Sequence, residues 1–347
     1  MRAVGAVSSR PEYGGLEARA VADVDGAAVE ALVAAHSLSR LQREPPFVGE
    51  PRHAHLWADV RQTMTSSDAE SAAFVGPDNA ESRHGGVRGL CIVRTPDWDR
   101  EHFGFVLGRI EYLIAADGIA ATAALEWALE RLSAAGASVV SARVPAEDLA
   151  VIGALEAAGF GFMEHLLTPW RAWKAWEPKH ADATRFTEPE DLPILYNIAR
   201  ATFRTDHFHL DPRFDPAAAD GVYARWIESW HADPPPGARS RVIVVDGRVS
   251  GFFMYRFTEP AGLAGHAGGE SKTRRVTDLV LGGMAPDMAG RGQGYRMYCD
   301  VMDDAAANTE YGRVTIVTAN VAVLNLYMKL GFRFSTGGEV TFHKWLA

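Results

Sequence analysis

The stretch MAPDMAGRGQGYRMY, residues 284–298, places three glycines between two regular elements. The residues before it, RRVTDLVLGGMAP, are rich in β-branched residues and leucine, which predicts a strand that ends at Pro286. The residues after it predict a helix that begins on the glycine-rich turn. Glycines let backbone N–H groups converge on an anion, and a helix N-terminus adds partial positive charge. The stretch therefore indicates an α/β fold with a cradle for a pyrophosphate; the alternative is a turn that binds nothing.

Two common nucleotide-binding motifs do not explain this turn. The sequence AGRGQGY, residues 289–295, contains no GxxxxGK[ST] pattern, so it is not a P-loop. It also lacks the GxGxxG spacing and the acidic residue about 20 positions later that a dinucleotide-binding fold requires.

A second motif, NVAVLNLYMKLGF at residues 320–332, predicts a helix that ends at Gly331. Asn320, Val323 and Tyr327 recur at intervals of three and four residues, so their side chains fall near one helix face. A phenol at such a place can donate a proton to a leaving thiolate. A tyrosine that only packs in the core is the alternative interpretation.

The order strand, helix, Gly-Phe and strand occurs twice in the sequence. It runs through residues 136–164 and again through residues 312–335, with Gly159 and Gly331 placed 172 residues apart. This repetition predicts a tandem duplication of an α/β unit, with a boundary near residue 180. In this alignment Asp148 and Leu155 take the places of Asn320 and Tyr327, and no glycine-rich turn precedes the helix near residue 120.

Composition excludes several classes of protein. The 347 residues are enough for two domains, and 47% hydrophobic with 23% charged residues is typical of a globular protein. The net charge of −9 argues against a general nucleic-acid binder. The two cysteines form no CxxC or Cys/His cluster, so neither a disulfide framework nor a structural zinc is expected. Without a signal peptide or an apolar stretch of about 18 residues, we expect a cytoplasmic protein with no membrane contact.

These motifs resemble those of the GNAT superfamily of acyl-CoA-dependent N-acyltransferases. The superfamily signature [QR]xxGx[GA] is matched at Gly292 and Gly294, with Ala289 in the first, usually polar, position. The later pattern NxxAxxLYxxxGF is matched except at Val323, where alanine is usual. The resemblance implies two tandem GNAT-like domains, each a mixed, mostly antiparallel sheet flanked by helices. It implies a degenerate domain without a CoA motif at residues 1–180 and a catalytic domain that binds acyl-CoA at residues 181–347.

The resemblance also implies a reaction and the residues that carry it. An acceptor amine attacks the thioester of acetyl-CoA directly and Tyr327 protonates the departing sulfur. For the base that takes the amine proton, the residues themselves offer Asp278, in the strand before the glycine turn, and the cluster Asp206, His207, His209 and Asp211, and none of them is singled out. The strand at 276–286 is expected to splay from its neighbour so that backbone groups bind the pantetheine arm and the thioester oxygen. The residues that the resemblance assigns to acetyl-CoA are Met284, Ala285, Ala289, Gly290, Arg291, Gly292, Gln293, Gly294, Tyr295 and Asn320.

A looser resemblance concerns the acceptor. WDREHFGFVLGRI at 98–110, ATFRTDHFHLDPRF at 201–214 and the terminal FHKWL look like segments of the TDP-fucosamine acetyltransferase family. This favours a nucleotide-linked amino sugar as the acceptor. The candidate acceptor-binding residues are Arg204, Asp206, His207, His209 and Asp211. An ordinary surface loop is one alternative. A metal site at this His/Asp cluster is another, but it is the less favoured one, and we expect no metal.

Other functions stay open at this point. The chain could acylate an amino acid, a peptide or an antibiotic amine, or transfer an amino acid from a charged tRNA, although its acidic charge argues against the last. A non-catalytic module that only binds acyl-CoA is a further alternative. Retention of Asn320 and Tyr327 beside the glycines argues against that module. Many members of the superfamily form homodimers, but no residue of this sequence indicates one.

Overall fold

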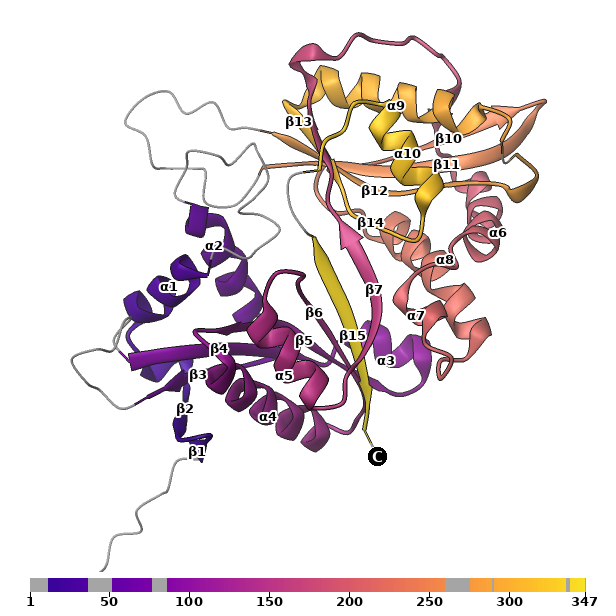
Figure 1. The fold of residues 1–347 in the computed structure, drawn as a ribbon. Coiled ribbons are helices and arrows are strands. Elements are labelled where there is room, and N and C mark those ends of the chain that lie inside the picture. The colour runs from indigo at the N-terminus through magenta and orange to yellow at the C-terminus, as the bar shows by residue number, and fades with distance from the viewer. Residues whose placement is uncertain are drawn as a thin grey trace, which may run out of the picture. The chain divides into compact units, whose positions relative to one another are not determined.

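The computed structural model describes residues 12–36, 52–76, 86–259, 275–288, 290–334 and 338–346 (Figure 1). These residues form two compact units. The first unit contains the described residues up to 162 together with 340–346, and the second contains 163–339. The strand formed by residues 339–345 thus joins the first unit although it follows the second in sequence. The division into a degenerate domain up to residue 180 and a catalytic domain after it stays a prediction.

The first unit is an α/β unit built on a mixed sheet. Its strands are hydrogen-bonded in the order β1-β2-β3-β4-β5-β6-β15. The pairing of β5 with β6 is parallel, whereas the pairs from β1 to β5 are antiparallel. Its helices and strands are β1 (Glu12–Tyr13), β2 (Leu16–Ala20), α1 (Gly26–Ala35), α2 (Arg52–Met64), β3 (Ala69–Val75), β4 (Val87–Arg94), α3 (Asp97–Phe103), β5 (Val106–Ala115), α4 (Gly118–Ala134), β6 (Ala137–Pro145), α5 (Leu149–Ala157) and β15 (Glu339–Trp345).

Helices cover both faces of the first sheet. On one face α4 and α5 contribute an alanine-rich surface with Leu125, Leu132 and Leu155 to the core. On the other face α1 and α2 pack Leu32 and Val60 against strand residues. Because both faces are buried, the strands carry long apolar runs rather than strict alternation.

The second unit repeats this architecture. Its main sheet has the order β8-β13-β12-β11-β10-β9, with β12 and β13 parallel and the other pairs antiparallel. Strand β7 pairs separately with β14. Its helices and strands are β7 (Gly161–Leu167), β8 (Trp170–Ala172), β9 (Thr184–Phe186), α6 (Leu192–Thr202), α7 (His207–Leu210), α8 (Pro216–Ala232), β10 (Ala238–Val245), β11 (Arg248–Thr258), β12 (Val276–Met284), α9 (Gln293–Asn308), β13 (Tyr311–Val314), β14 (Ile316–Val317) and α10 (Val321–Lys329).

The second sheet is also sandwiched between helices (Figure 1). Helices α9 and α10 pack on one face, where Met297, Val301 and Tyr327 meet Phe253 and Leu279. Helices α6 and α8 pack on the other face. The predicted α/β fold, with mixed and mostly antiparallel sheets flanked by helices, is therefore confirmed in both units.

Local signals fix the ends of several elements. Asp25 caps α1 by accepting a hydrogen bond from the backbone N–H of Ala27. Asp246 and Gly247, a pair that favours two-residue hairpin turns, both have positive φ and close the β10–β11 hairpin. The glycine-rich stretch at residues 261–272 lies outside the described residues. In the described part of the chain, no helix combines the length and apolar character needed to cross a membrane.

Candidate functional site

The N-terminus of α9 is built by the glycine-rich turn. Gly290 and Gly292 have φ of 73° and 74°, a left-handed backbone that glycine adopts without strain. Gly292 is the N-cap residue, and no side chain caps the helix among the described residues. Among the described residues, a Cβ atom added at Gly290 or Gly292 would meet no atom within 4 Å beyond those of its chain neighbours. The described residues therefore leave space beside both glycines.

This arrangement suits an anion. The first backbone bond into the helix runs from Arg296 N–H to Gly292 C=O, so the N–H groups of Gln293, Gly294 and Tyr295 have no partner inside the helix. Aligned peptide dipoles place partial positive charge at the same point. Arg291 is exposed beside it. The residues present thus fit a pyrophosphate, whereas Ala289 lies outside the described residues.

Strand β12 loses its pairing with β13 toward the end that leads to this turn. It pairs with β13 only from Val276 to Leu279, where Leu279 faces Val314. Beyond that point the edge of β12 up to Met284 has no paired strand on this side among the described residues. On its other side, pairing with β11 slips so that Val280 is an extra residue, a β-bulge. The strand therefore splays, as the sequence predicts.

Two residues predicted to bind the pantetheine arm already make contacts at the end of β12. The N–H of Ala285 donates to the C=O of Ser250 at 2.8 Å. The C=O of Met284 accepts from Thr202 Oγ1 at 3.1 Å. These groups hold the strand end in place, and the free edge of β12 lies before them, between Val280 and Met284.

Asn320 is the N-cap of α10. Its Oδ1 atom accepts from the N–H of Val323 at 3.3 Å, which leaves its Nδ2 atom as the donor for other partners. Asn320 therefore has a structural role as a helix cap. Its contact with acyl-CoA stays a prediction.

Tyr327 lies in the core of the second unit, with 1% of its surface exposed. Its ring packs edge-to-face against Tyr298, with centroids 5.3 Å apart, and against Phe332 at 4.8 Å. Burial raises the pKa of Tyr327 well above its usual value, so its phenol stays protonated at neutral pH. A protonated phenol is what a general acid needs, and Tyr327 as that acid stays a prediction.

Asp278 lies in the part of β12 that is still paired. Its Oδ1 atom accepts from Arg313 Nε at 2.5 Å and its Oδ2 atom from Arg256 Nε at 3.1 Å. Burial alone would raise the pKa of Asp278, but the two guanidinium groups outweigh it and lower the pKa. A carboxylate held in this way is a weak proton acceptor. Its predicted role as the base is therefore not favoured by these ion pairs.

The predicted acceptor-binding residues include a compact ionic cluster around α7. Asp206 caps α7 and accepts from His209 Nδ1 at 2.7 Å, while His209 Nε2 lies 3.2 Å from Asp220. Asp220 also pairs with Arg204 at 3.0 Å. Burial would lower the pKa of His209, but the two carboxylates outweigh it and raise the pKa. These contacts among the side chains fix the start of α7 next to α8.

The remaining residues of that segment are placed differently. Asp211 is buried and forms a two-pronged ion pair with Arg213, at 2.8 and 2.9 Å. The ring of His207 packs on Phe208, with centroids 3.9 Å apart. Among the described residues, no three His, Cys, Asp or Glu side chains are grouped as metal ligands.

In the first unit the N-terminus of the corresponding helix, α4, is capped by a side chain. Helix α4 begins at Asp117, whose carboxylate accepts from Ala120 N–H at 2.9 Å and pairs with Arg88. The Ala120 hydrogen bond lowers the pKa of Asp117, so the carboxylate stays charged. A negative side chain therefore already occupies the helix N-terminus. Leu155 packs in the core at the place that Tyr327 takes in the second unit.

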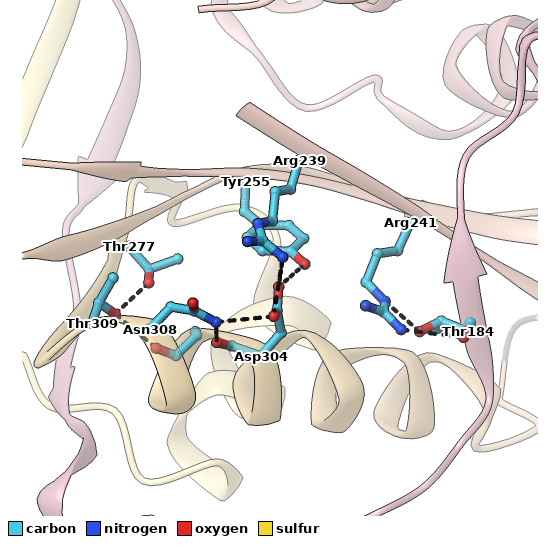
Figure 2. Close-up of polar contacts among 9 residues, drawn as sticks. Thr184, Arg239, Arg241, Tyr255, Thr277, Asp304, Asn308 and Thr309 are labelled. Carbon is cyan, nitrogen blue, oxygen red and sulfur yellow. Dashed lines mark hydrogen bonds and ion pairs between the residues drawn. The ribbon is translucent and has the colours of Figure 1, made fainter. Parts of the chain in front are cut away.

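A polar network that the sequence did not indicate fixes the other end of α9 (Figure 2). Asp304 accepts a hydrogen bond from Tyr255 of β11 and pairs with Arg239 of β10 at 3.2 Å. Asn308 donates to Asp304 at 3.1 Å and so joins the same group. Arg239 and Tyr255 come from strands far from Asp304 in the sequence, so no local pattern could reveal these two contacts. Its effect is to anchor α9 to the sheet and thus hold the glycine turn in place.

The segment that the sequence marks as a boundary is also tied to α9. Asp303 accepts from Trp176 Nε1 at 2.7 Å and from the N–H of His180 at 2.9 Å. Asp300 accepts from the N–H groups of Ala183 and Thr184 at 2.7 and 2.8 Å. This chain segment therefore runs along α9 rather than forming a free linker.

Sequence comparison gives no family for this chain: no protein-family model and no curated protein matches it. Comparison with solved structures shows likenesses of fold. A GCN5-related N-acetyltransferase from Sphaerobacter thermophilus superposes with a TM-score of 0.59 and 14% identity, over 97% of each chain. A tandem GNAT protein from the clavulanic acid biosynthesis pathway superposes with a TM-score of 0.52 and 15% identity, over 95% of this chain and 98% of that one.

A third neighbour is the GCN5-related glucosamine N-acetyltransferase region of a fungal multi-domain GH3 beta-N-acetylglucosaminidase. It has a TM-score of 0.58 and 12% identity, and it covers 94% of this chain and 38% of that one. At such low identities these likenesses concern the fold. The chain therefore has the fold of the GNAT N-acetyltransferases, in the tandem form with two GNAT-like units in one polypeptide.

Proposed function

We propose that the second unit transfers an acyl group, with acetyl favoured, from acyl-CoA to the nitrogen of a small amine. The observation that carries this proposal is the uncapped N-terminus of α9 next to the splayed edge of β12. The first unit has the same fold but lacks this opening, because Asp117 caps α4. The tandem GNAT fold supports the same reaction class.

The glycine turn and the first turn of α9 would hold the pyrophosphate of acyl-CoA. Backbone N–H groups from Gln293 to Tyr295 supply donors, and Arg291 adds a positive charge. Lys329 of α10 lies 4.7 Å from the ring centre of Tyr295, so a second cation is close to the first turn. Acyl-CoA would supply the activated thioester that the reaction consumes.

The free edge of β12 would position the acyl group. Backbone N–H groups between Val280 and Met284 that no neighbouring strand takes up are suited to the pantetheine arm and the thioester oxygen. Tyr327 is the proposed source of the proton for the departing sulfur. The neutral amine attacks the thioester carbon directly, without a covalent intermediate on the protein. The C–N bond forms, the C–S bond breaks, and the proton that the nitrogen loses passes to a base or to solvent.

The favoured acceptor is a nucleotide-linked amino sugar. This rests on the resemblance of residues 98–110 and 201–214 to sugar-nucleotide acetyltransferases. The fungal structural neighbour, named a glucosamine N-acetyltransferase region, is an instance of this fold paired with an amino-sugar acceptor. Amino acids, peptides and antibiotic amines are the other acceptors to be compared in the same assay.

The deciding experiment changes the charge at one helix terminus. Gly292→Asp places a carboxylate at the N-terminus of α9, where Asp117 places one at α4, and Gly292→Asn is the matched control. Asp and Asn are the non-glycine residues that best tolerate a left-handed backbone, and they differ by one negative charge. Calorimetric titration with acetyl-CoA should show one site per chain in the wild type. We expect the aspartate variant to bind about tenfold more weakly than the asparagine variant, or not at all.

The outcomes separate the candidate functions. Equal affinity in the two variants would place the pyrophosphate elsewhere and contradict the proposed site. Binding without thiol release, with amino-sugar nucleotides, amino acids, peptides and aminoglycosides all tested as acceptors, would identify a module that only binds acyl-CoA. Absence of binding at about millimolar acetyl-CoA would remove acetyl-CoA as the donor.

A further inference from the structure

The last part of β12 carries no side chain at two successive positions. Gly282 and Gly283 follow one another in the stretch beyond Leu279, where β13 no longer pairs with β12. Successive residues of a strand point to opposite faces of the sheet. Because glycine has no Cβ atom, the space beside the strand is bounded here, on each face, by side chains that come from other elements.

On the face that α9 covers, these neighbours belong to the core. A Cβ atom added at Gly282 would lie 2.7 Å from Phe253 Cδ2 and 3.3 Å from Tyr298 Oη. Both rings are buried, with 1% of Phe253 and 5% of Tyr298 exposed. Neither ring can move aside without disturbing the packing of α9 on the sheet. This face therefore has no room for a chain of carbon atoms beside Gly282.

On the face that α6 covers, the nearest side chain is that of Phe203. Among the described residues, a Cβ atom added at Gly283 would lie 3.1 Å from Phe203 Cζ and 3.3 Å from Phe252 Cε1. Phe252 is fully buried in β11, whereas Phe203 is half-buried at the end of α6. Phe203 is thus the ring that closes this face at the border between the core and the surface.

Several contacts hold Phe203 in this position. Its backbone N–H donates to the C=O of Ala199 at 3.2 Å and so ends α6. The residue before it, Thr202, donates from Oγ1 to the C=O of Met284 at 3.1 Å, which ties the end of α6 to the end of β12. The ring of Phe203 also packs on Tyr223 of α8, with centroids 4.7 Å apart. A larger group beside Gly283 would have to displace this anchored ring.

We propose that Phe203 limits the acyl group of the donor to about two or three carbon atoms; this rests on the proposed function. There the thioester lies along the free edge of β12 between Val280 and Met284, so the acyl group lies beside Gly283. An acetyl group ends in a single methyl group and stops at the Phe203 ring. Each further methylene enters the space that the ring fills, and overpacking a filled site is unfavourable.

The test compares acetyl-CoA, butyryl-CoA and hexanoyl-CoA as donors for four forms of the full chain. They are the wild type, Phe203→Leu, Phe203→Ala and, as the matched control, Phe257→Ala. Phe257 is also half-buried, but it pairs with Thr277 in the part of β12 that still pairs with β13. Its removal deletes a ring of the same size from the same sheet, away from the free edge.

The measured quantity is the ratio of kcat/KM for hexanoyl-CoA to kcat/KM for acetyl-CoA. A thiol-release assay gives both values, with the amine that the wild type acetylates fastest among amino-sugar nucleotides, amino acids, peptides and aminoglycosides. Because the ratio compares two donors on one preparation, it does not depend on how much of a variant is folded. Loss of stability alone therefore leaves the ratio unchanged.

We expect the wild type to use hexanoyl-CoA at least about a hundredfold less well than acetyl-CoA. Phe203→Ala removes the six carbon atoms of the ring, whereas hexanoyl exceeds acetyl by four. The ratio should therefore rise by about tenfold or more in Phe203→Ala. Phe203→Leu, which shortens the side chain less, should admit butyryl-CoA and give an intermediate ratio. The control should keep the ratio within about twofold of the wild type.

Each contrary outcome has its own meaning. Equal use of hexanoyl-CoA and acetyl-CoA by the wild type would show that no acyl limit exists, with the transferase function intact. A limit that persists in both Phe203 variants would assign it to another group. A ratio that rises as much in Phe257→Ala would mean only a loosened sheet and would also overturn the proposal. If the wild type transfers no acyl group from any of the three donors, the proposed function itself fails and the acyl limit fails with it.

Discussion

Asp148 and Asn320 hold the same position at the start of two helices, 172 residues apart in sequence. Asp148 Oδ1 accepts from the N–H of Val151 at 3.2 Å, and Asn320 Oδ1 accepts from the N–H of Val323 at 3.3 Å. Each helix has nine residues and is followed by a glycine with positive φ, Gly159 or Gly331. The same local geometry is thus built from an acid in one unit and an amide in the other.

The first prediction concerns this cap. Asn320→Ala removes the acceptor for the Val323 N–H and should lower the free energy of unfolding by about 1 kcal/mol. Asn320→Asp should keep most of it, because Asp148 performs the same task in the first unit. Urea unfolding of both variants checks this. Equal loss of stability in the two variants would mean that the amide donor, and not the capping oxygen, matters at this position.

The second prediction concerns Asp278. Asp278→Asn breaks the ion pairs with Arg313 and Arg256 and should cost about 3 kcal/mol of stability. Because the folded pKa of Asp278 is lowered, its contribution is present at neutral pH and is lost as pH falls through that pKa. Unfolding curves across acidic pH check the sign. A folded variant with unchanged kcat near pH 8 would fit a structural role, whereas a large loss of kcat would restore Asp278 as the base.

The third prediction concerns the pH dependence set by His209. Its pKa is raised by Asp206 and Asp220, so the folded state binds the proton more tightly than the unfolded state. Its stabilising effect is complete below the unfolded pKa of about 6.5 and disappears as pH rises through the higher folded pKa. The gap in unfolding free energy between the wild type and His209→Gln should therefore shrink from about pH 5.5 to pH 9. A gap that grows with pH would contradict the raised pKa.

The fourth prediction concerns Gly282 in β12. Gly282→Ala would bring a methyl group to 2.7 Å from Phe253 and 3.3 Å from Tyr298 Oη. We expect overpacking to lower the free energy of unfolding by about 1–3 kcal/mol. Gly153→Ala is the control, because that glycine lies in α5 with open space around it, and this variant should gain up to about 1 kcal/mol. Thermal unfolding of both variants measures the two effects, and equal stability of Gly282→Ala and the wild type would contradict the prediction.

Sequence reasoning reached the features that short-range patterns encode. The glycine turn before α9 and the repeat carrying Gly159 and Gly331 both depend on residues close together in the chain. The splay of β12 followed from the family resemblance. All of these are present in the structure.

Features that depend on distant partners have no signal in the sequence. The ion pairs of Asp278 could not be predicted, because Arg256 and Arg313 lie 22 and 35 residues away. The packing of Tyr298 could not be predicted either, because Gly282 and Tyr327 belong to other elements. Such neighbours are chosen by the packing of helices on a sheet, which local patterns do not specify.

The place of β15 has a consequence for how the protein is made. The strand joins the sheet of the first unit beside β6, where Leu346 N–H bonds to Ser138 C=O and Arg143 Nε donates to Thr341 Oγ1. During synthesis, β6 therefore cannot pair with β15 until nearly 200 further residues have left the ribosome. Until then an unpaired strand edge is exposed to other chains. If the first unit were expressed without β15, the edge of β6 would stay unpaired permanently. In a circular permutation that puts β15 ahead of β1, β6 could pair with β15 as soon as β6 is made.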